Sequence, residues 1–170
     1  MYGSYDYDYF GIRQWNEILA PNEQGVGGLY LGQLEFVHSD KIEKMKIGAV
    51  VSIIGYTVTI DSSRNVKHLF IQAEDDEEEE IKKHFQMTYD FIHENLKKTN
   101  VFVHCQMGIS RSSSIVIAYL MKERGTDFLD TLNFVRSKRE CVNPNQGFVY
   151  QLIEYSKELE NQKKQSNINI

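Results

Sequence analysis

The sequence predicts an α/β fold, a single domain in which a mixed, mostly parallel central sheet is flanked by helices. Two observations lead to this prediction. Short apolar runs of strand length alternate along the chain with longer stretches whose apolar residues recur every three or four positions. A polar, glycine-containing segment also connects a central apolar strand, residues 101–103, to a helix that is apolar all round, residues 115–121. Strands that alternate with helices favour parallel pairing with both sheet faces covered.

The first half of the chain is predicted to hold three strands and two short helices. Residues 1–24 read as an N-terminal arm, rich in tyrosine (Tyr2, Tyr5, Tyr7, Tyr9), and a short helix over 12–19 that ends before Pro21. Residues 28–31 and the branched run 49–54 have the composition of strands. Between them, Ser39 or Asp40 is placed to cap a helix that runs to about Lys46. A strand over 56–60, a turn over 61–65 and another strand over 66–72 follow.

The second half is predicted to be mainly helical. A long helix over 77–98 places one apolar stripe inward (Ile81, Phe85, Thr88, Ile92, Leu96). Gly125 is predicted to end the helix that begins after the polar segment, and Thr126 or Asp127 to cap the next one, which reaches about Lys138. Asn145 starts a last helix, and residues 161–170 read as a frayed tail. The folded domain is therefore expected over residues 25–160.

The polar segment contains the candidate catalytic residues. Residues 105–111, here named the phosphate loop, precede a helix whose unpaired N-terminal amides and dipole favour an anion. Cys105 opens the loop, Gly108 lets it curl closely, and Arg111 closes it. Converging amides and a guanidinium favour a thiolate, the nucleophilic form of cysteine. An arginine also forks two N–H groups onto two phosphoryl oxygens, which lysine cannot do.

The segment His104-Cys105-x-x-Gly108-x-x-Arg111-Ser112 resembles the signature loop of cysteine-based protein tyrosine phosphatases, and its surroundings resemble the small dual-specificity phosphatases. The resemblance extends from about Gly25 to Leu159 and includes further motifs at residues 28–32, 71–75, 118–121 and 142–145. It implies that residues 25–160 form the catalytic domain of a protein phosphatase. Such an enzyme hydrolyses phosphotyrosine and phosphoserine or phosphothreonine through a cysteinyl-phosphate intermediate.

The resemblance also implies roles for particular residues. Cys105 is the nucleophile, Arg111 holds the phosphoryl group, His104 lies behind the loop and orients it, and Ser112 stabilises the thiolate. Asp75 is the implied general acid, with Asp76 as the alternative one position on. Phosphate is expected to bind along the whole loop, at Gln106, Met107, Gly108, Ile109, Ser110 and Arg111. Ser110, Ser113 and Ser114 read as helix-start residues rather than catalysts, Asn143 and Asn145 as scaffold, and Cys141 as a structural residue.

Charge and composition limit the partners and cofactors. The net charge of −5 is concentrated in seven consecutive carboxylates, residues 74–80, here named the acidic segment. We therefore expect a phosphorylated protein substrate, no nucleic-acid or membrane partner, and a monomer. The apolar run 115–121 is far shorter than the ~20 residues of a membrane span. His104 and Cys105 lack a second ligand pair, so neither a metal nor another cofactor is expected. A reactive thiol predicts a reducing compartment, cytoplasmic or also nuclear.

Two alternative functions remain open at this point. The same loop chemistry serves phosphatases of phosphoinositides or of RNA 5′ ends, although Gln106, Met107 and Ile109 bring no basic charge for such polyanions. A non-catalytic module that binds phosphoproteins is the other alternative. The presence of both Cys105 and Arg111 disfavours it, because such a module needs no nucleophile.

Overall fold

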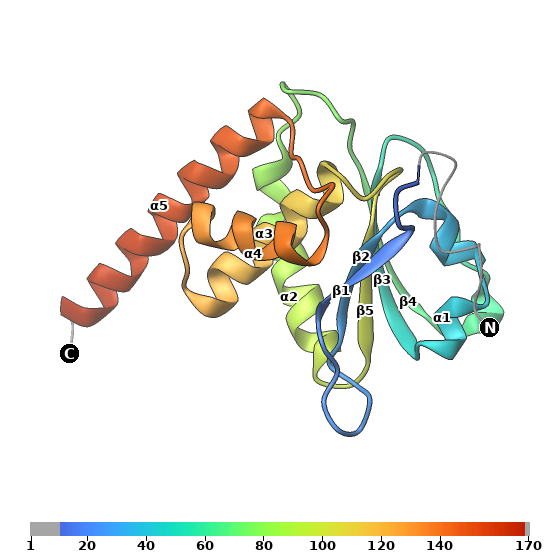
Figure 1. Cartoon of the computed structure of the whole chain (residues 1–170). Coiled ribbons are helices and arrows are strands. Elements are labelled where there is room, and N and C mark those ends of the chain that lie inside the picture. Colours follow the sequence, from blue (N-terminus) through green and yellow to red (C-terminus); the bar gives the residue numbers. More distant parts are fainter. Residues whose placement is uncertain (1–10, 169–170) are drawn as a thin grey trace.

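A computed structural model describes residues 11–168 and shows one five-stranded sheet within that range (Figure 1). The strands lie in the order β1-β2-β5-β3-β4. Only β1 is antiparallel to its neighbour, and the other pairs are parallel. The predicted mixed, mostly parallel sheet is confirmed. The strands span β1 Trp15–Leu19, β2 Leu29–Gly32, β3 Ile47–Ile54, β4 Lys67–Gln72 and β5 Asn100–His104.

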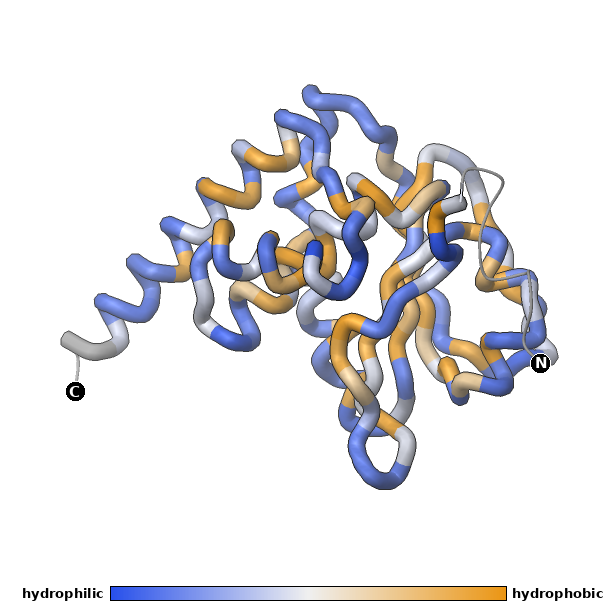
Figure 2. The backbone as a smooth tube through the Cα atoms, in the orientation of Figure 1, coloured by the Kyte–Doolittle hydropathy of each residue, from blue (hydrophilic) through white to orange (hydrophobic). Residues whose placement is uncertain are grey.

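Helices cover the two faces of the sheet unequally (Figure 1). On one face, α2 Phe85–Leu96, α3 Arg111–Arg124 and α4 Phe128–Lys138 contact the strands, and α5 Gln146–Ile168 packs mainly on α3. The other face is covered by α1 Lys41–Lys44 and the 3₁₀ turn Leu34–His38, with a further 3₁₀ turn at Ser62–Arg64. In the hydropathy view, apolar residues are frequent along the strands, and apolar and polar stretches alternate along the helices (Figure 2).

The alternation of side chains along β5 shows how the strands separate two cores. Val101 and Val103 join the core beneath α2–α5, whereas Phe102 belongs to the core on the other face, where it stacks on Phe36 with ring centroids 4.1 Å apart. Both faces of β5 are therefore fully buried, as expected for a central parallel strand. This leaves only its carboxyl end free to carry a functional loop.

Several predicted helix boundaries are confirmed. Gly125 adopts a left-handed conformation (φ 66°) and ends α3, because a residue without Cβ adopts that backbone at little cost. The carboxylate of Asp127 accepts a hydrogen bond from the Asp130 amide, 2.8 Å, and caps α4. Asn145 caps α5 by accepting from the Phe148 amide, 2.9 Å.

The prediction of a short helix over 12–19 is wrong, because residues 15–19 form β1 at the sheet edge. Five residues are too few for periodicity to separate helix from strand, and the partner strand decides. β2 offers its free edge, and Gly32 leaves room for the β1 backbone: a Cβ there would clash with the Gln14 carbonyl. The domain therefore begins before residue 25. The predicted tyrosine-rich arm, residues 1–10, lies outside the described residues.

The predicted strand over 56–60 is also wrong, since these residues run beside the sheet without joining it. β3 is already paired with β5 on one side and β4 on the other, so the segment that follows it cannot pair back onto β3 as a hairpin. Val58 instead buries its side chain against the core that contains Phe36. The helix predicted from Ser39 or Asp40 is confined to the four residues of α1.

The acidic segment is not helical, which corrects the predicted helix start at residue 77. Helical structure begins only at the 3₁₀ turn Ile81–His84 and continues as α2. Consecutive carboxylates repel one another at helical spacing, which disfavours a helix there. The predicted inward stripe is otherwise confirmed: Ile81, Phe85, Thr88 and Ile92 are buried, and Leu96 is partly buried against the same core.

The frayed tail predicted over 161–170 is wrong for its described part, because α5 continues to Ile168. Lys163 on this extension donates to the Gly125 carbonyl, 2.7 Å, at the C-terminal end of α3. A cation there complements the negative end of the α3 dipole, which favours continued helix. No helix among the described residues is long and apolar enough to span a membrane.

Candidate active site

The phosphate loop lies at the carboxyl end of β5 and leads directly into α3. Parallel sheets of this kind place their ligands at that edge. Gly108 has a positive φ of 67°, and a Cβ on it would clash with the Gly32 backbone. The loop can therefore pack against β2 only because residue 108 is glycine.

Each backbone carbonyl from Cys105 to Ser110 accepts a hydrogen bond from the surrounding protein. The donors are the His104 ring (Nδ1 to Cys105 O, 3.0 Å), Leu34 N (to Gln106 O, 3.2 Å), Arg139 (to Met107 O, 2.9 Å, and Gly108 O, 2.8 Å), Asn143 N (to Ile109 O, 2.9 Å) and Ser114 N (to Ser110 O, 3.0 Å). A trans peptide points its N–H opposite to its C=O. With the carbonyls bound outward, the amides of the loop face its concave side, where an anion would bind.

The sulfur of Cys105 is the focus of this concave side. It accepts the Gly108 amide at 3.2 Å and the Ser112 hydroxyl at 3.1 Å, and the residue is 2% exposed. Hydrogen bonds donated to sulfur favour the thiolate over the thiol. The predicted pairing of Ser112 with Cys105 is thus present in the geometry.

Arg111 is buried beside the loop with part of its guanidinium unused. Its Nη1 donates to the Ala73 carbonyl at 3.1 Å, which ties α3 to the chain just before the acidic segment. Its Nε is buried and has no hydrogen-bond partner among the described residues. Because an unsatisfied buried donor is costly, this N–H is suited to an anion bound in the loop.

Asp75 and Asp76, which the sequence leaves as alternatives, differ in position. The Asp75 Oδ1 accepts the Ser110 hydroxyl at 2.7 Å and the Asn145 side-chain amide at 2.9 Å, so its carboxylate lies against the phosphate loop. The Asp76 carboxylate instead accepts the Glu78 amide at 2.8 Å within the acidic segment. The structure therefore brings Asp75, and not Asp76, to the loop.

Ser110 and Asn145 are site residues whose contact with Asp75 the sequence did not predict. The Ser110 hydroxyl also accepts the Asn145 backbone amide at 3.0 Å, which closes a triangle with the carboxylate. Asn145 lies 70 positions after Asp75, so no local spacing signals the contact. Its match to a family turn motif was the one available sign of importance.

A buried polar chain supports the loop from behind. The Ser52 hydroxyl contacts His104 Nε2 at 2.6 Å and His68 Nε2 at 2.7 Å. Because His104 Nδ1 donates to the Cys105 carbonyl, its Nε2 accepts from Ser52, whose oxygen in turn accepts from His68. When His104 is neutral, each hydrogen bond in this chain therefore has one donor and one acceptor. Burial lowers the pKa of His104 to about 4 and also lowers the pKa of His68.

Other candidate residues lie at the rim or elsewhere. The half-exposed Tyr56 donates its hydroxyl to the Gln106 side chain at the start of the loop. Ser113 donates to the Ile109 carbonyl at 2.6 Å and Ser114 to the Ser110 carbonyl at 2.8 Å, consistent with their predicted place at the helix start. The described residues contain no cluster of three or more His, Cys, Asp or Glu side chains suited to a metal.

The chain is similar to known proteins in both sequence and structure. The family model described as "Dual specificity phosphatase, catalytic domain" matches residues 29–158. Human dual specificity protein phosphatase 22 is 37% identical over 136 residues, which cover 76% of this chain and 71% of that protein. Drosophila melanogaster dual specificity protein phosphatase MPK-4 is 39% identical over 136 residues, 74% of this chain but only 33% of that protein. The crystal structure of DUSP15 matches with a TM-score of 0.73 and 35% identity, covering 82% of this chain and 92% of that one.

The low pKa of His104 predicts an acid-sensitive fold. The unfolded chain binds a proton at this histidine near pH 6.5, whereas the folded protein does so only near pH 4. The contribution of His104 to the free energy of unfolding is fully present above about pH 6.5. It falls by about 3 kcal/mol as the pH drops to about 4. Urea denaturation at several pH values should show that His104→Asn, although less stable at neutral pH, loses correspondingly less on acidification. An equal loss in the variant and the wild type would contradict the assignment.

Proposed function

The chain belongs to the dual-specificity phosphatase family, and we propose from this that it hydrolyses phosphotyrosine and phosphoserine or phosphothreonine in proteins. The observation that carries the proposal is the convergence of two hydrogen-bond donors on the Cys105 sulfur, together with the buried Nε of Arg111 in the same loop, which has no hydrogen-bond partner among the described residues. A nucleophile and a guanidinium at one anion-binding loop are what phosphoryl transfer through a covalent intermediate requires.

In the proposed first step the Cys105 thiolate attacks phosphorus in line with the leaving oxygen. A sulfur–phosphorus bond forms as the phosphorus–oxygen ester bond breaks. The loop amides and Arg111 bind the three equatorial oxygens, where negative charge is spread in the transition state. Asp75 gives its proton to the leaving alkoxide or phenoxide.

In the second step water attacks the cysteinyl phosphate. Asp75, now a carboxylate, accepts a proton from that water, and the thiolate leaves as inorganic phosphate forms. Ser112, 3.1 Å from the sulfur, would donate to the thiolate as the sulfur–phosphorus bond breaks. His104 supports the loop from behind through the Cys105 carbonyl and is given no proton transfer.

The contacts of Asp75 support its choice over Asp76 as the general acid. Ser110 and Asn145 hold one carboxylate oxygen, Oδ1, beside the loop, which leaves Oδ2 for a proton. Asp76 is instead bound within its own turn. The remaining carboxylates of the acidic segment are proposed to be solvated charges with no part in the chemistry.

The proposed substrates are phosphorylated proteins, which the family implies. The neutral side chains of Gln106, Met107 and Ile109 do not favour phosphoinositides or RNA 5′ ends. We propose a role in signalling. We also propose that the protein acts in the cytoplasm or nucleus, because a nucleophilic thiol must stay reduced.

Replacement of the nucleophile should separate binding from chemistry. Cys105→Ser should abolish turnover of p-nitrophenyl phosphate yet still bind a phosphotyrosyl peptide, because the amides and Arg111 remain. Arg111→Lys should lose both, since a lysine cannot reproduce the fork. Steady-state assays and calorimetric titration with the peptide would test this. More than a trace of activity in Cys105→Ser would rule out the covalent mechanism.

Asp75→Asn should slow hydrolysis of esters with poor leaving groups by roughly 10²- to 10⁴-fold, because the leaving oxygen then departs without a proton. Esters whose leaving group needs no proton should be barely affected. The matched control is Asp76→Asn, which should show no such dependence on leaving group. The measurement is kcat/KM across a series of aryl phosphates. If only Asp76→Asn showed the dependence, the acid would move by one residue; if neither did, it would lie elsewhere.

Dual specificity predicts comparable use of two substrate types. We expect a shallow pocket, so kcat/KM on matched phosphotyrosyl and phosphothreonyl peptides should differ by less than about a thousandfold, some 4 kcal/mol. Tyr56 stands half-exposed at the rim beside Gln106, where it can contact either residue type. A larger preference for phosphotyrosine would indicate a deep site that only the longer side chain reaches.

A further inference from the structure

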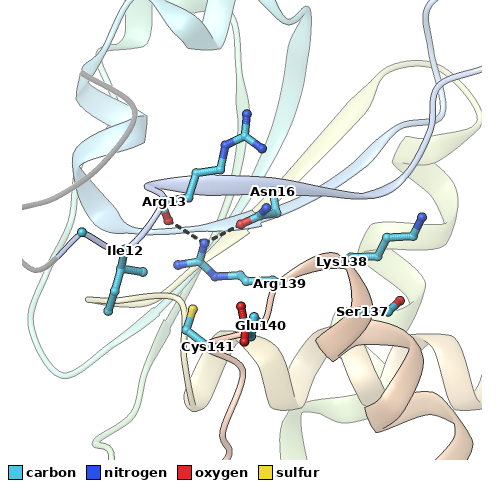
Figure 3. A pocket seen from close by; sticks show the side chains of 9 residues that line it. Ile12, Arg13, Asn16, Ser137, Lys138, Arg139, Glu140 and Cys141 are labelled. Atoms are coloured by element: carbon cyan, nitrogen blue, oxygen red, sulfur yellow. Dashed lines mark hydrogen bonds between the residues drawn. The ribbon is translucent and has the colours of Figure 1, made fainter. Parts of the chain in front are cut away.

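Arg139 is the largest fully buried side chain of the described protein, yet it is a cation. It follows directly after α4, and its guanidinium reaches the convex side of the phosphate loop. Nη2 donates to the Met107 carbonyl at 2.9 Å, and Nε to the Gly108 carbonyl at 2.8 Å. Nη1 donates to the Arg13 carbonyl at 2.6 Å and the Asn16 side chain at 2.8 Å (Figure 3). Arginine side chains are almost never fully buried unless they are paired.

Arg139 is connected to the Cys105 sulfur through a single peptide unit. The peptide unit between Met107 and Gly108 accepts from Arg139 through its oxygen and donates to the Cys105 sulfur through its nitrogen, 3.2 Å. The next peptide unit is held in the same way, because Arg139 Nε binds the Gly108 oxygen and so turns the Ile109 N–H inward. A donor on the carbonyl also polarises the peptide, which strengthens the hydrogen bond its N–H gives.

We infer that Arg139 is a positioning residue for the phosphate loop: its guanidinium turns and polarises the two peptide units whose N–H groups serve the Cys105 thiolate and the bound phosphoryl group. This inference rests on the proposed function, since it assigns a role to a residue that does not itself touch substrate. The planar fork of an arginine fits two consecutive carbonyls, and a lysine has no second fixed donor for the second carbonyl.

The surroundings of Arg139 make the inference testable in folded protein. A cavity of about 600 Å³ opens beside it, lined by Arg13, Asn16 and residues 137–141 (Figure 3). When the guanidinium is removed, water from this cavity can reach the Met107 and Gly108 carbonyls and satisfy them in part. The loop would then keep its hydrogen bonds but lose the fixed orientation and the positive charge behind it.

The test compares Arg139→Met and Arg139→Lys with Arg64→Met. Arg64 is the matched control, because its guanidinium also donates to two backbone carbonyls, those of Val37 at 2.9 Å and Ser39 at 3.0 Å, and neither carbonyl belongs to the phosphate loop. The first readout is the rate of Cys105 alkylation by iodoacetamide, followed by mass spectrometry, as a ratio between about pH 6 and about pH 9, which reports the thiolate fraction. The second is kcat/KM for p-nitrophenyl phosphate, and the third is the competitive inhibition constant of orthovanadate. Tm is measured for every variant.

Arg139→Met should lower the alkylation ratio and kcat/KM by about 10- to 100-fold and weaken orthovanadate inhibition similarly, with Arg139→Lys in between. Arg64→Met should stay within about twofold of the wild type. If Arg139 served stability alone, Tm would fall while the alkylation ratio stayed unchanged, and this result would overturn the inference. If Arg139→Met did not fold, Arg139→Lys would decide by the same criterion. Wild-type protein without turnover would instead contradict the proposed function.

Discussion

The outward hydrogen bonding of the phosphate-loop carbonyls is the constraint on which the site depends. Six consecutive carbonyls are bound by donors from β5, from the chain after β2, from the end of α4, from the connection between α4 and α5, and from α3. Only when these donors are in place do the loop amides face inward. The fold thus builds an anion site mainly from backbone groups, and the sheet and helices hold those groups in position.

The same constraint explains why distant parts of the chain meet at the loop. β1 and the residues just before it contribute through Asn16 and Arg13, which hold Arg139, and the N-terminal cap of α5 contributes through Asn145, which holds Asp75. Arg111 joins α3 to the Ala73 carbonyl, just ahead of Asp75. The proposed nucleophile, phosphoryl clamp and acid are therefore fixed relative to one another by contacts that cross the whole domain.

Buried polar groups around the loop are tolerated because they are paired. The chain from His68 through Ser52 and His104 to the Cys105 carbonyl places each proton between a donor and an acceptor. Burial then keeps His104 neutral, as its lowered pKa reflects. The buried Nε of Arg111 departs from this pattern. That departure lies where the proposed chemistry needs a donor, and an unsatisfied donor of this kind is expected at a functional site.

The sequence by itself determined whatever depends on neighbouring residues. The loop motif from His104 to Ser112, the strands β2 to β5, the cap at Asp127 and the end of α3 at Gly125 are set by local periodicity, sterics and capping chemistry. The tertiary structure decided the rest. Residues 15–19 form a strand because β2 offers an edge, and residues 56–60 do not because both edges of β3 are taken. The acidic segment stays outside α2, and α5 extends past residue 160 where Lys163 meets the end of α3. The contacts of Asp75 with Asn145 and of Arg139 with the phosphate loop join residues far apart in the chain, and hydrogen bonds of that kind leave no periodic signal in a single sequence.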